Sequence, residues 1–180
     1  MNPEQFKANI NGVAKTNRYR VFIDTKSIGI DLPPYYQYLT KEVAFPGKEI
    51  RTTEMSYWGG NRMVAQTADY DPLTITFYSD SKLELRRAFV EWITKKIINM
   101  STWTCGYYND YTTTLYIEVL NQKNEIIDKI KVEEAYPKSL TETTLSWENN
   151  DMPFEFSVSF QYFDWVPESF QGENITVNNK

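Results

Sequence analysis

Hydrophobic and polar residues alternate with a period of two along much of this chain, which predicts β-strands with one buried face. The clearest stretch is 154–162, where Phe, Val and Tyr alternate with Glu, Ser and Gln. The same pattern, or an extended aromatic or Thr-rich composition, predicts further strands at 18–23, 35–43, 49–57, 73–78, 114–119, 126–132 and 143–147. Pro137 is expected to end one of these elements, because proline cannot donate to a strand ladder.

One segment changes to the period of a helix. Ser81 and Glu84 have the spacing of a capping box, and the apolar residues that follow recur at i, i+3, i+4, i+7 and i+8. We therefore expect a helix over Ser81–Ile97 that buries one stripe. The core-facing stripe is predicted to comprise Leu85, Ala88, Phe89, Trp92 and Ile93.

Glycines between two of the strands mark a turn. Gly59-Gly60-Asn61 is a strong turn signal, and the aperiodic stretch 62–70 after it predicts a projecting loop or loose hairpin. About eight strands and one helix indicate a mainly β fold, an antiparallel β-sandwich or open barrel with one covering helix. We expect three parts: an N-terminal arm at 1–17, a single domain at 18–166 and a flexible C-terminal tail at 167–180.

The composition excludes several classes of function. The chain of 180 residues has a net charge of −5 and no histidine, and Cys105 is its only cysteine. No Ser-His or Cys-His catalytic pair and no zinc site with those ligands can be built from it, so we expect neither an enzyme nor a cofactor. An acidic protein also lacks the basic surface that coats DNA. No apolar run reaches the length of a membrane span, so no membrane insertion is expected.

One acidic pair needs to be weighed as a metal site. Asp69 and Asp71 have the spacing that opens a calcium loop, but positions six and twelve of that loop are Thr74 and Asp80 instead of Gly and Glu. We therefore interpret the pair as a solvated turn and expect no metal.

A set of short polar or acidic residues lies on the predicted outward faces of several strands and contains no Lys or Arg. Such a face is either ordinary solvent surface or the lining of a water-filled passage, since phosphate affinity comes from basic side chains. Composition leaves both interpretations open. The candidate channel-lining residues are Thr74, Thr76, Thr144, Ser146, Glu148, Glu155, Ser157, Ser159 and Gln161.

Aromatic residues make up 16% of the chain. They favour strand packing and subunit contacts, where Tyr and Trp are enriched. The alternative is a stacking platform for sugars or single-stranded nucleic acid, as in a carbohydrate-binding β-sandwich. The residues that could form such a platform are Tyr35, Tyr36, Tyr38, Tyr57, Trp58, Trp103, Tyr107, Tyr108 and Tyr111.

Two ordered segments carry a resemblance to a known family. The first is the strand Asp71–Asp80 leading into a helix with a Phe89-x-x-Trp92 core. The second runs from Ala135-Tyr-Pro through Leu145-Ser-Trp to the strand that ends in Trp165. Together they resemble the tail tube proteins of contractile-tailed, T-even-type bacteriophages over about residues 15–166. Phe45-Pro46-Gly47 also resembles a Pro-Gly step in that family.

The resemblance implies a virion protein that is assembled in the host cytoplasm. Six copies would form a ring whose strands merge into one inner β-barrel, and rings would stack into a hollow tube. Implied partners are further copies of the chain, a sheath protein, a baseplate or tube initiator and a tail terminator. DNA would pass through without specific binding. Candidate contacts between subunits or rings are the N-terminal arm and Tyr57, Trp58, Gly59, Gly60, Asn61 and Arg62.

Two related functions remain open beside the main tube. The chain could be a tube initiator or baseplate tube protein, or the tube of a phage-derived contractile injection system. In the tail tube, the polar side of the predicted helix is a candidate surface for the sheath.

Overall fold

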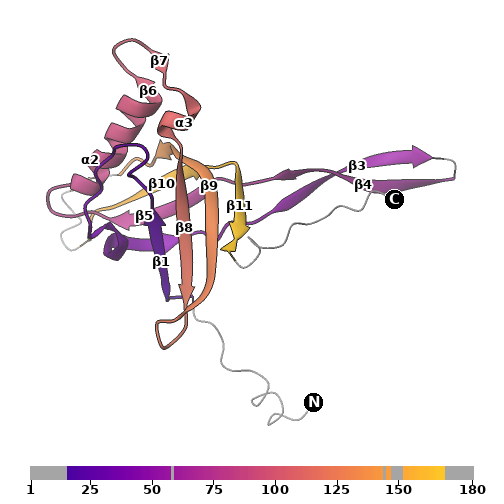
Figure 1. Cartoon of the computed structure of the whole chain (residues 1–180), viewed down its shortest axis with the longest axis horizontal. Coiled ribbons are helices and arrows are strands. Elements are labelled where there is room, and N and C mark those ends of the chain that lie inside the picture. The colour runs from indigo at the N-terminus through magenta and orange to yellow at the C-terminus, as the bar shows by residue number, and fades with distance from the viewer. Residues whose placement is uncertain (1–15, 58, 144, 147–151, 169–180) are drawn as a thin grey trace, which may run out of the picture.

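The computed structural model describes residues 16–57, 59–143, 145–146 and 152–168 (Figure 1). The predicted arm and tail, together with Trp58, Thr144 and Glu148, lie almost or entirely outside these residues. The strands are β1 (Tyr19–Ile23), β2 (Thr40–Val43), β3 (Glu49–Tyr57), β4 (Gly60–Asp69), β5 (Leu73–Tyr78), β6 (Ile98–Asn99), β7 (Thr104–Cys105), β8 (Thr113–Leu120), β9 (Ile126–Leu140), β10 (Glu155–Gln161) and β11 (Asp164–Pro167). The helical elements are η1 (Tyr36–Leu39), α2 (Glu84–Glu91), η2 (Trp92–Ile97) and α3 (Tyr108–Tyr111).

Most of the strands form one antiparallel sheet of seven, in the order β1-β8-β9-β10-β5-β2, with β11 also paired to β9. Strand β9 holds the sheet together, because its first half pairs with β8 and β11 and its second half with β10. Glu134, between the two halves, has a left-handed backbone with φ of 54°. The predicted class, a mainly β antiparallel fold with one covering helix, is confirmed.

The core lies between this sheet and the helix. Leu73, Ile75 and Phe77 of β5 are buried, as are the inward residues of β10. Phe89 of α2 packs against Phe77, Phe156 and Phe160, with ring centroids 5.4, 6.2 and 6.0 Å away. The helix therefore closes the hydrophobic side of the β5–β10 pair.

Along the helix, Leu85, Phe89 and Trp92 are fully buried, while Ile93 is half-buried. The Trp92 indole Nε1 donates to the Tyr111 carbonyl at 2.9 Å, so the buried ring leaves no polar atom unpaired. From Trp92 to Ile97 the helix widens into a π-helix.

The predicted capping box is wrong. Helix α2 begins at Glu84, three residues later than expected, and no side chain caps its first residue. Leu83 has a left-handed backbone with φ of 57°, which separates Ser81 from the helix. The Glu84 carboxylate instead accepts a hydrogen bond of 2.9 Å from the Tyr35 hydroxyl, so it does not reach back to Ser81.

Three other predicted strands differ from the structure. The 35–43 segment begins as the 3-10 turn η1, because the buried Tyr36 hydroxyl accepts a hydrogen bond from the Ile23 amide at 2.8 Å. Pro137 does not end β9; it lies inside the strand opposite Phe160, where the register shifts because Lys138 is an extra residue in β9. No strand forms at the described residues of 143–147.

Strands β3 and β4 form a long hairpin that projects from the body (Figure 1). It continues the β2–β5 pair outward, since β2 leads into β3 and β4 leads into β5. Gly59 occupies the turn with φ of 96°, a conformation that glycine adopts without strain. The predicted loose hairpin over 62–70 is thus a regular strand with one register shift, opposite Arg51 and Thr52.

Replacing Trp92 with alanine should lower the free energy of unfolding by about 3–5 kcal/mol, because it opens a large cavity beneath α2. Chemical denaturation of the two proteins measures the difference. The matched control is Trp103→Ala, at a tryptophan that is 78% exposed, which should change stability by less than about 0.5 kcal/mol. Equal losses in the two variants would contradict the assignment of the helix stripe to the core.

Candidate assembly surfaces

A band of small hydroxyl side chains covers the side of β5 and β10 that faces away from the core. Thr74 Oγ1 and Ser159 Oγ lie 3.0 Å apart, and Thr76 Oγ1 and Ser157 Oγ lie 2.9 Å apart. These cross-strand pairs follow from the register, in which Thr74 is opposite Ser159 and Thr76 opposite Ser157. We call these four residues the hydroxyl face.

The hydroxyl face extends onto the neighbouring strands. Ser139 of β9 is opposite Ser159, and Gln161 is opposite Tyr136. At the other end Lys41 of β2 forms an ion pair with Glu155, with a distance of 2.5 Å between Nζ and Oε2. The hydrogen bond to Glu155 raises the pKa of Lys41.

Sequence analysis missed Lys41, because its place beside Glu155 depends on the pairing of β2 with β5 and of β5 with β10. Ser146, a predicted channel residue, lies on a loop and lines a shallow pocket that also includes Lys41 and Glu155. The structure therefore brings together the predicted residues of β5 and β10 with Ser146, and Thr144 and Glu148 lie outside the described residues.

The β3–β4 hairpin is a second candidate surface. Every residue of β4 is exposed, and the hairpin carries the apolar side chains of Ile50, Met55, Met63 and Val64 in solvent. A two-stranded ribbon is marginally stable by itself in water. Near its tip, two of the predicted contact residues pair with β3, since Asn61 is opposite Ser56 and Arg62 is opposite Met55.

A cluster at the base of the hairpin fixes it to the body. The Trp165 Nε1 donates to the Gly47 carbonyl at 3.2 Å, and Lys48 Nζ lies 5.2 Å from the centre of the Tyr70 ring and 5.5 Å from that of Trp165. Asp164 pairs with the same ammonium at 3.3 Å. Hydrogen bonds that the Lys48 ammonium donates to Tyr70 and to the Asp164 carboxylate raise the pKa of Lys48.

These features accompany a match to a known family. A family model described as "Phage tail tube protein" matches residues 3–168 of the chain. The chain belongs to the phage tail tube protein family. It is a structural component of a phage-type tail, as the resemblance predicted. A comparison with curated proteins found no match.

Three solved structures illustrate the fold that this tail tube protein shares with other proteins. One is a sheath-tube complex of the extracellular contractile injection system PVC in its extended state, at a TM-score of 0.60 and 16% identity, covering 93% of this chain and 98% of that one. Another is the tube terminating cap of the anti-feeding prophage, at a TM-score of 0.65 and 14% identity, covering 88% and 93%. A third, from the baseplate of that prophage, has a TM-score of 0.62 at 11% identity and covers 88% and 97%.

Among the residues that the structure describes, the aromatic residues predicted for a stacking platform do not all gather in one place. Tyr36 is buried, and Tyr35 is tied to Glu84. Tyr108 and Tyr111 pack edge to face with Tyr136 on β9. Partial burial, followed by a hydrogen bond that the phenol donates to Glu134, raises the pKa of Tyr108 to about 12.

Asp69, weighed above as a metal ligand and interpreted as part of a solvated turn, is the last residue of β4. Asp69 pairs with Arg51 across the hairpin at 2.7 Å. Within the described residues no group of three His, Cys, Asp or Glu side chains could hold a metal ion. None of the helices in that part of the chain is long and apolar enough to cross a membrane.

Removing one hydroxyl pair should reveal its coupling across the sheet. In a double-mutant cycle with Thr76→Val and Ser157→Ala, we expect a coupling of about 0.2–1 kcal/mol in the free energy of unfolding, typical of cross-strand pairs. The control cycle combines Thr76→Val with Ser101→Ala, an exposed serine on another element, and should be additive. Additivity in both cycles would show that the hydroxyls of β5 and β10 do not interact.

Proposed function

We propose that copies of this tail tube protein form closed rings of six, and that the rings stack into the hollow inner tube of a contractile tail. The hydroxyl face lines the channel, and DNA passes along it during ejection. The observation that carries this proposal is the pairing of the hydroxyls of β5 with those of β10, on the side opposite the core.

Paired hydroxyls suit a surface over which a polyanion slides. Each threonine in the two pairs shares a hydrogen bond with a serine on the next strand, so these groups have less capacity left to hold phosphate oxygens. Affinity for DNA comes mainly from Lys and Arg, and Lys41, at the edge of this face, is paired with Glu155. The face can therefore contact passing DNA without retaining it.

Unpaired strand edges support ring formation. Strands β1 and β2 end the seven-stranded sheet, and within the described part of the chain each pairs on one side only. Such edges invite pairing with another chain, and closure into a ring removes them. Merging β2, β5, β10 and the second half of β9 with the same strands of neighbouring copies would give a continuous inner barrel with the hydroxyl face inward.

The β3–β4 hairpin then contacts a neighbouring subunit or the next ring. Its exposed apolar residues need cover, and its base is fixed by Trp165 and Lys48, so it presents them in a constant direction. We assign the predicted contact residues at 57–62 to the same role.

The outer partners follow from the same arrangement. With the hydroxyl face inward, α2 lies on the far side of the sheet, where its polar residues, among them Arg87 and Glu91, can face a sheath. A baseplate or tube initiator would begin the tube and a terminator would end it. Similarity to chains of a sheath-tube complex, a baseplate and a cap supports these partners. Assembly would take place in the host cytoplasm.

A second candidate, the tube of a phage-derived injection system, is supported by similarity to the injection-system chains. The two functions differ in cargo. Particles purified with this protein should carry DNA-filled heads if it serves a phage, and should be headless if it serves an injection system.

The direct test is negative-stain electron microscopy of the purified protein over a concentration series. We expect rings or hollow tubes, and a three-dimensional reconstruction should place Thr74, Thr76, Ser157 and Ser159 on the channel wall. Tubes with these residues on the outside would overturn the channel assignment and leave the tube itself standing.

A charge on the hairpin should block assembly without unfolding the subunit. Met63→Glu places a carboxylate on a side chain that is 67% exposed, so the melting temperature should stay within about 1–2 °C while tube formation is lost. The matched control is Met152→Glu, at a methionine that is 77% exposed outside the hairpin, which should still form tubes. Normal tubes from Met63→Glu would exclude the hairpin from the contacts.

A further inference from the structure

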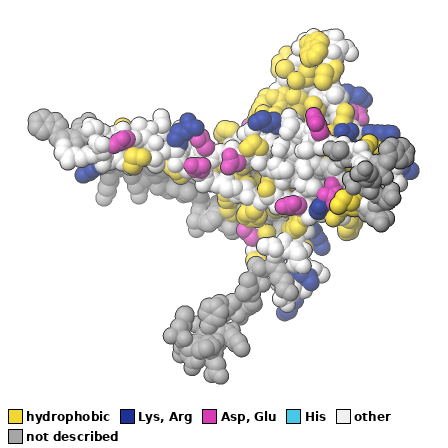
Figure 2. Space-filling model, turned by 180° about the vertical axis from the view of Figure 1, so that it is seen from behind, with side chains coloured by type: hydrophobic (Ala, Val, Ile, Leu, Met, Phe, Trp, Pro, Cys, Tyr) yellow, Lys and Arg dark blue, Asp and Glu magenta, His cyan; other side chains and the backbone are white. Residues whose placement is uncertain are grey.

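A short hairpin at the end of the helix presents several apolar side chains to solvent. It comprises β6, β7 and the residues around them, from Ile98 to Tyr108, and we call it the aromatic knob. Trp103 is 78% exposed and Tyr107 85%, and Met100 and Tyr108 are exposed as well. Figure 2 shows hydrophobic side chains gathered at the end of this protrusion. The knob contains no charged residue.

Hydrogen bonds hold the knob in one conformation. The amide of Trp103, at the tip, donates to the Asn99 carbonyl at 2.8 Å. Thr102 and Thr104 share a hydrogen bond of 2.8 Å between their hydroxyls. An uncharged protrusion that hydrogen bonds hold in place and that exposes a tryptophan has the composition of a binding hot spot rather than of ordinary surface.

Gly106 joins the knob to the helix. Its amide donates to the Ile97 carbonyl at 2.9 Å. A Cβ atom at this position would lie 2.3 Å from the Lys96 carbonyl oxygen, so only glycine allows this close approach. The knob is therefore a fixed extension of the helix end.

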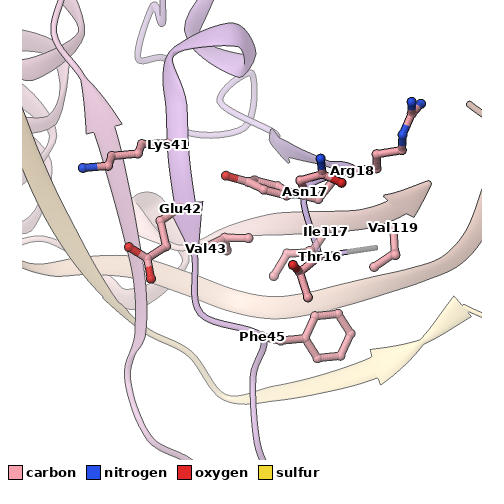
Figure 3. A pocket seen from close by; sticks show the side chains of 10 residues that line it. Thr16, Asn17, Arg18, Lys41, Glu42, Val43, Phe45, Ile117 and Val119 are labelled. Carbon is pink, nitrogen blue, oxygen red and sulfur yellow. The ribbon is translucent and has the colours of Figure 1, made fainter. Parts of the chain in front are cut away.

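The opposite end of the molecule has an apolar cleft of about 610 Å³ between the free edges of β1 and β2. Figure 3 shows Val43, Phe45, Ile117 and Val119 around its interior. The Phe45 ring is 54% exposed. Polar residues, Arg18 and Glu42 among them, stand at its rim, so the cleft has the apolar centre and polar edge of a protein-binding site.

The positions of knob and cleft determine the kind of contact they can make. The knob lies beyond the helix at one end of the fold, and the cleft lies at the start of β1 and the end of β8 at the other end (Figure 1). Two different patches on one chain give a head-to-tail contact between copies, which closes into rings or extends into filaments.

We propose that the aromatic knob of one copy inserts Trp103 into the β1–β2 cleft of the next copy. This contact rests on the proposed tube function and identifies a specific interface within it. The uncharged knob meets no repulsion from a cleft whose rim carries both signs of charge, and the cleft is within the size range that encloses aromatic groups.

Cys105, on the knob, permits a sharp test because it is the only cysteine of the chain. In Thr16→Cys the new thiol lies at the cleft, and mild oxidation of the assembled full-length protein should give a ladder of covalent oligomers on non-reducing gels. The matched control is Thr141→Cys, an exposed threonine outside knob and cleft. The control and the unaltered chain should give covalent dimers at most. The unaltered chain can form a disulfide only between two copies of Cys105, and the cysteine introduced at position 141 in the control lies outside the proposed contact.

The outcomes separate the contact from the tube. Tubes that yield no ladder from Thr16→Cys would overturn the knob contact and leave the proposed function intact. A ladder without tubes would support the contact and count against stacking into a tube. A protein that forms neither would overturn both. If Cys105 forms crosslinks only to an added sheath protein and not to other copies of the chain, the knob would be assigned to that partner and the contact between copies would be overturned.

A second variant tests the energy of the contact. Trp103→Ala should raise the protein concentration needed for assembly by more than tenfold, as expected for a hot-spot residue, with no change in melting temperature. Leu145→Ala, at a leucine that is also 78% exposed but outside the knob, should change that concentration less than threefold. Equal effects would show that Trp103 has no special part in assembly.

Discussion

The packing of α2 on the β5–β10 pair is the interaction on which the rest of this structure depends. Phe89 contacts the inward aromatic rings of both strands, and Trp92 lies beside it with its indole bonded to Tyr111. This contact closes one side of the central strands and leaves the other side free to carry hydroxyls. The candidate channel surface therefore exists because the helix occupies the opposite face.

Strands β5 and β10 could be predicted in detail from the sequence. Their alternation determined both the buried residues and the hydroxyl face, since side chains on a strand point to opposite sides in turn. The family resemblance rested on the same segments together with the helix, and the match over residues 3–168 agrees with it. Local pattern was sufficient for these strands because their alternation is regular and one face is buried.

Local pattern failed where contacts between distant segments decide the structure. The Glu84 carboxylate accepts a hydrogen bond from the Tyr35 hydroxyl instead of capping the helix. The side chain of Tyr36 points inward, where its hydroxyl accepts a hydrogen bond from the Ile23 amide. Lys41 reaches the hydroxyl face only through the pairing of three strands. Trp103 appeared among the aromatic residues of the sequence, but the uncharged knob that presents it depends on the close approach of Gly106 to the helix end.

The β3–β4 hairpin also has a mechanical consequence. Short connections join β2 to β3 and β4 to β5. Strands β2 and β5 form part of the sheet that carries the hydroxyl face. A force applied at the hairpin tip is therefore transmitted through covalent backbone to the strands of the proposed channel wall. If rings engage one another through these hairpins, tension along the tube would load the proposed channel wall directly.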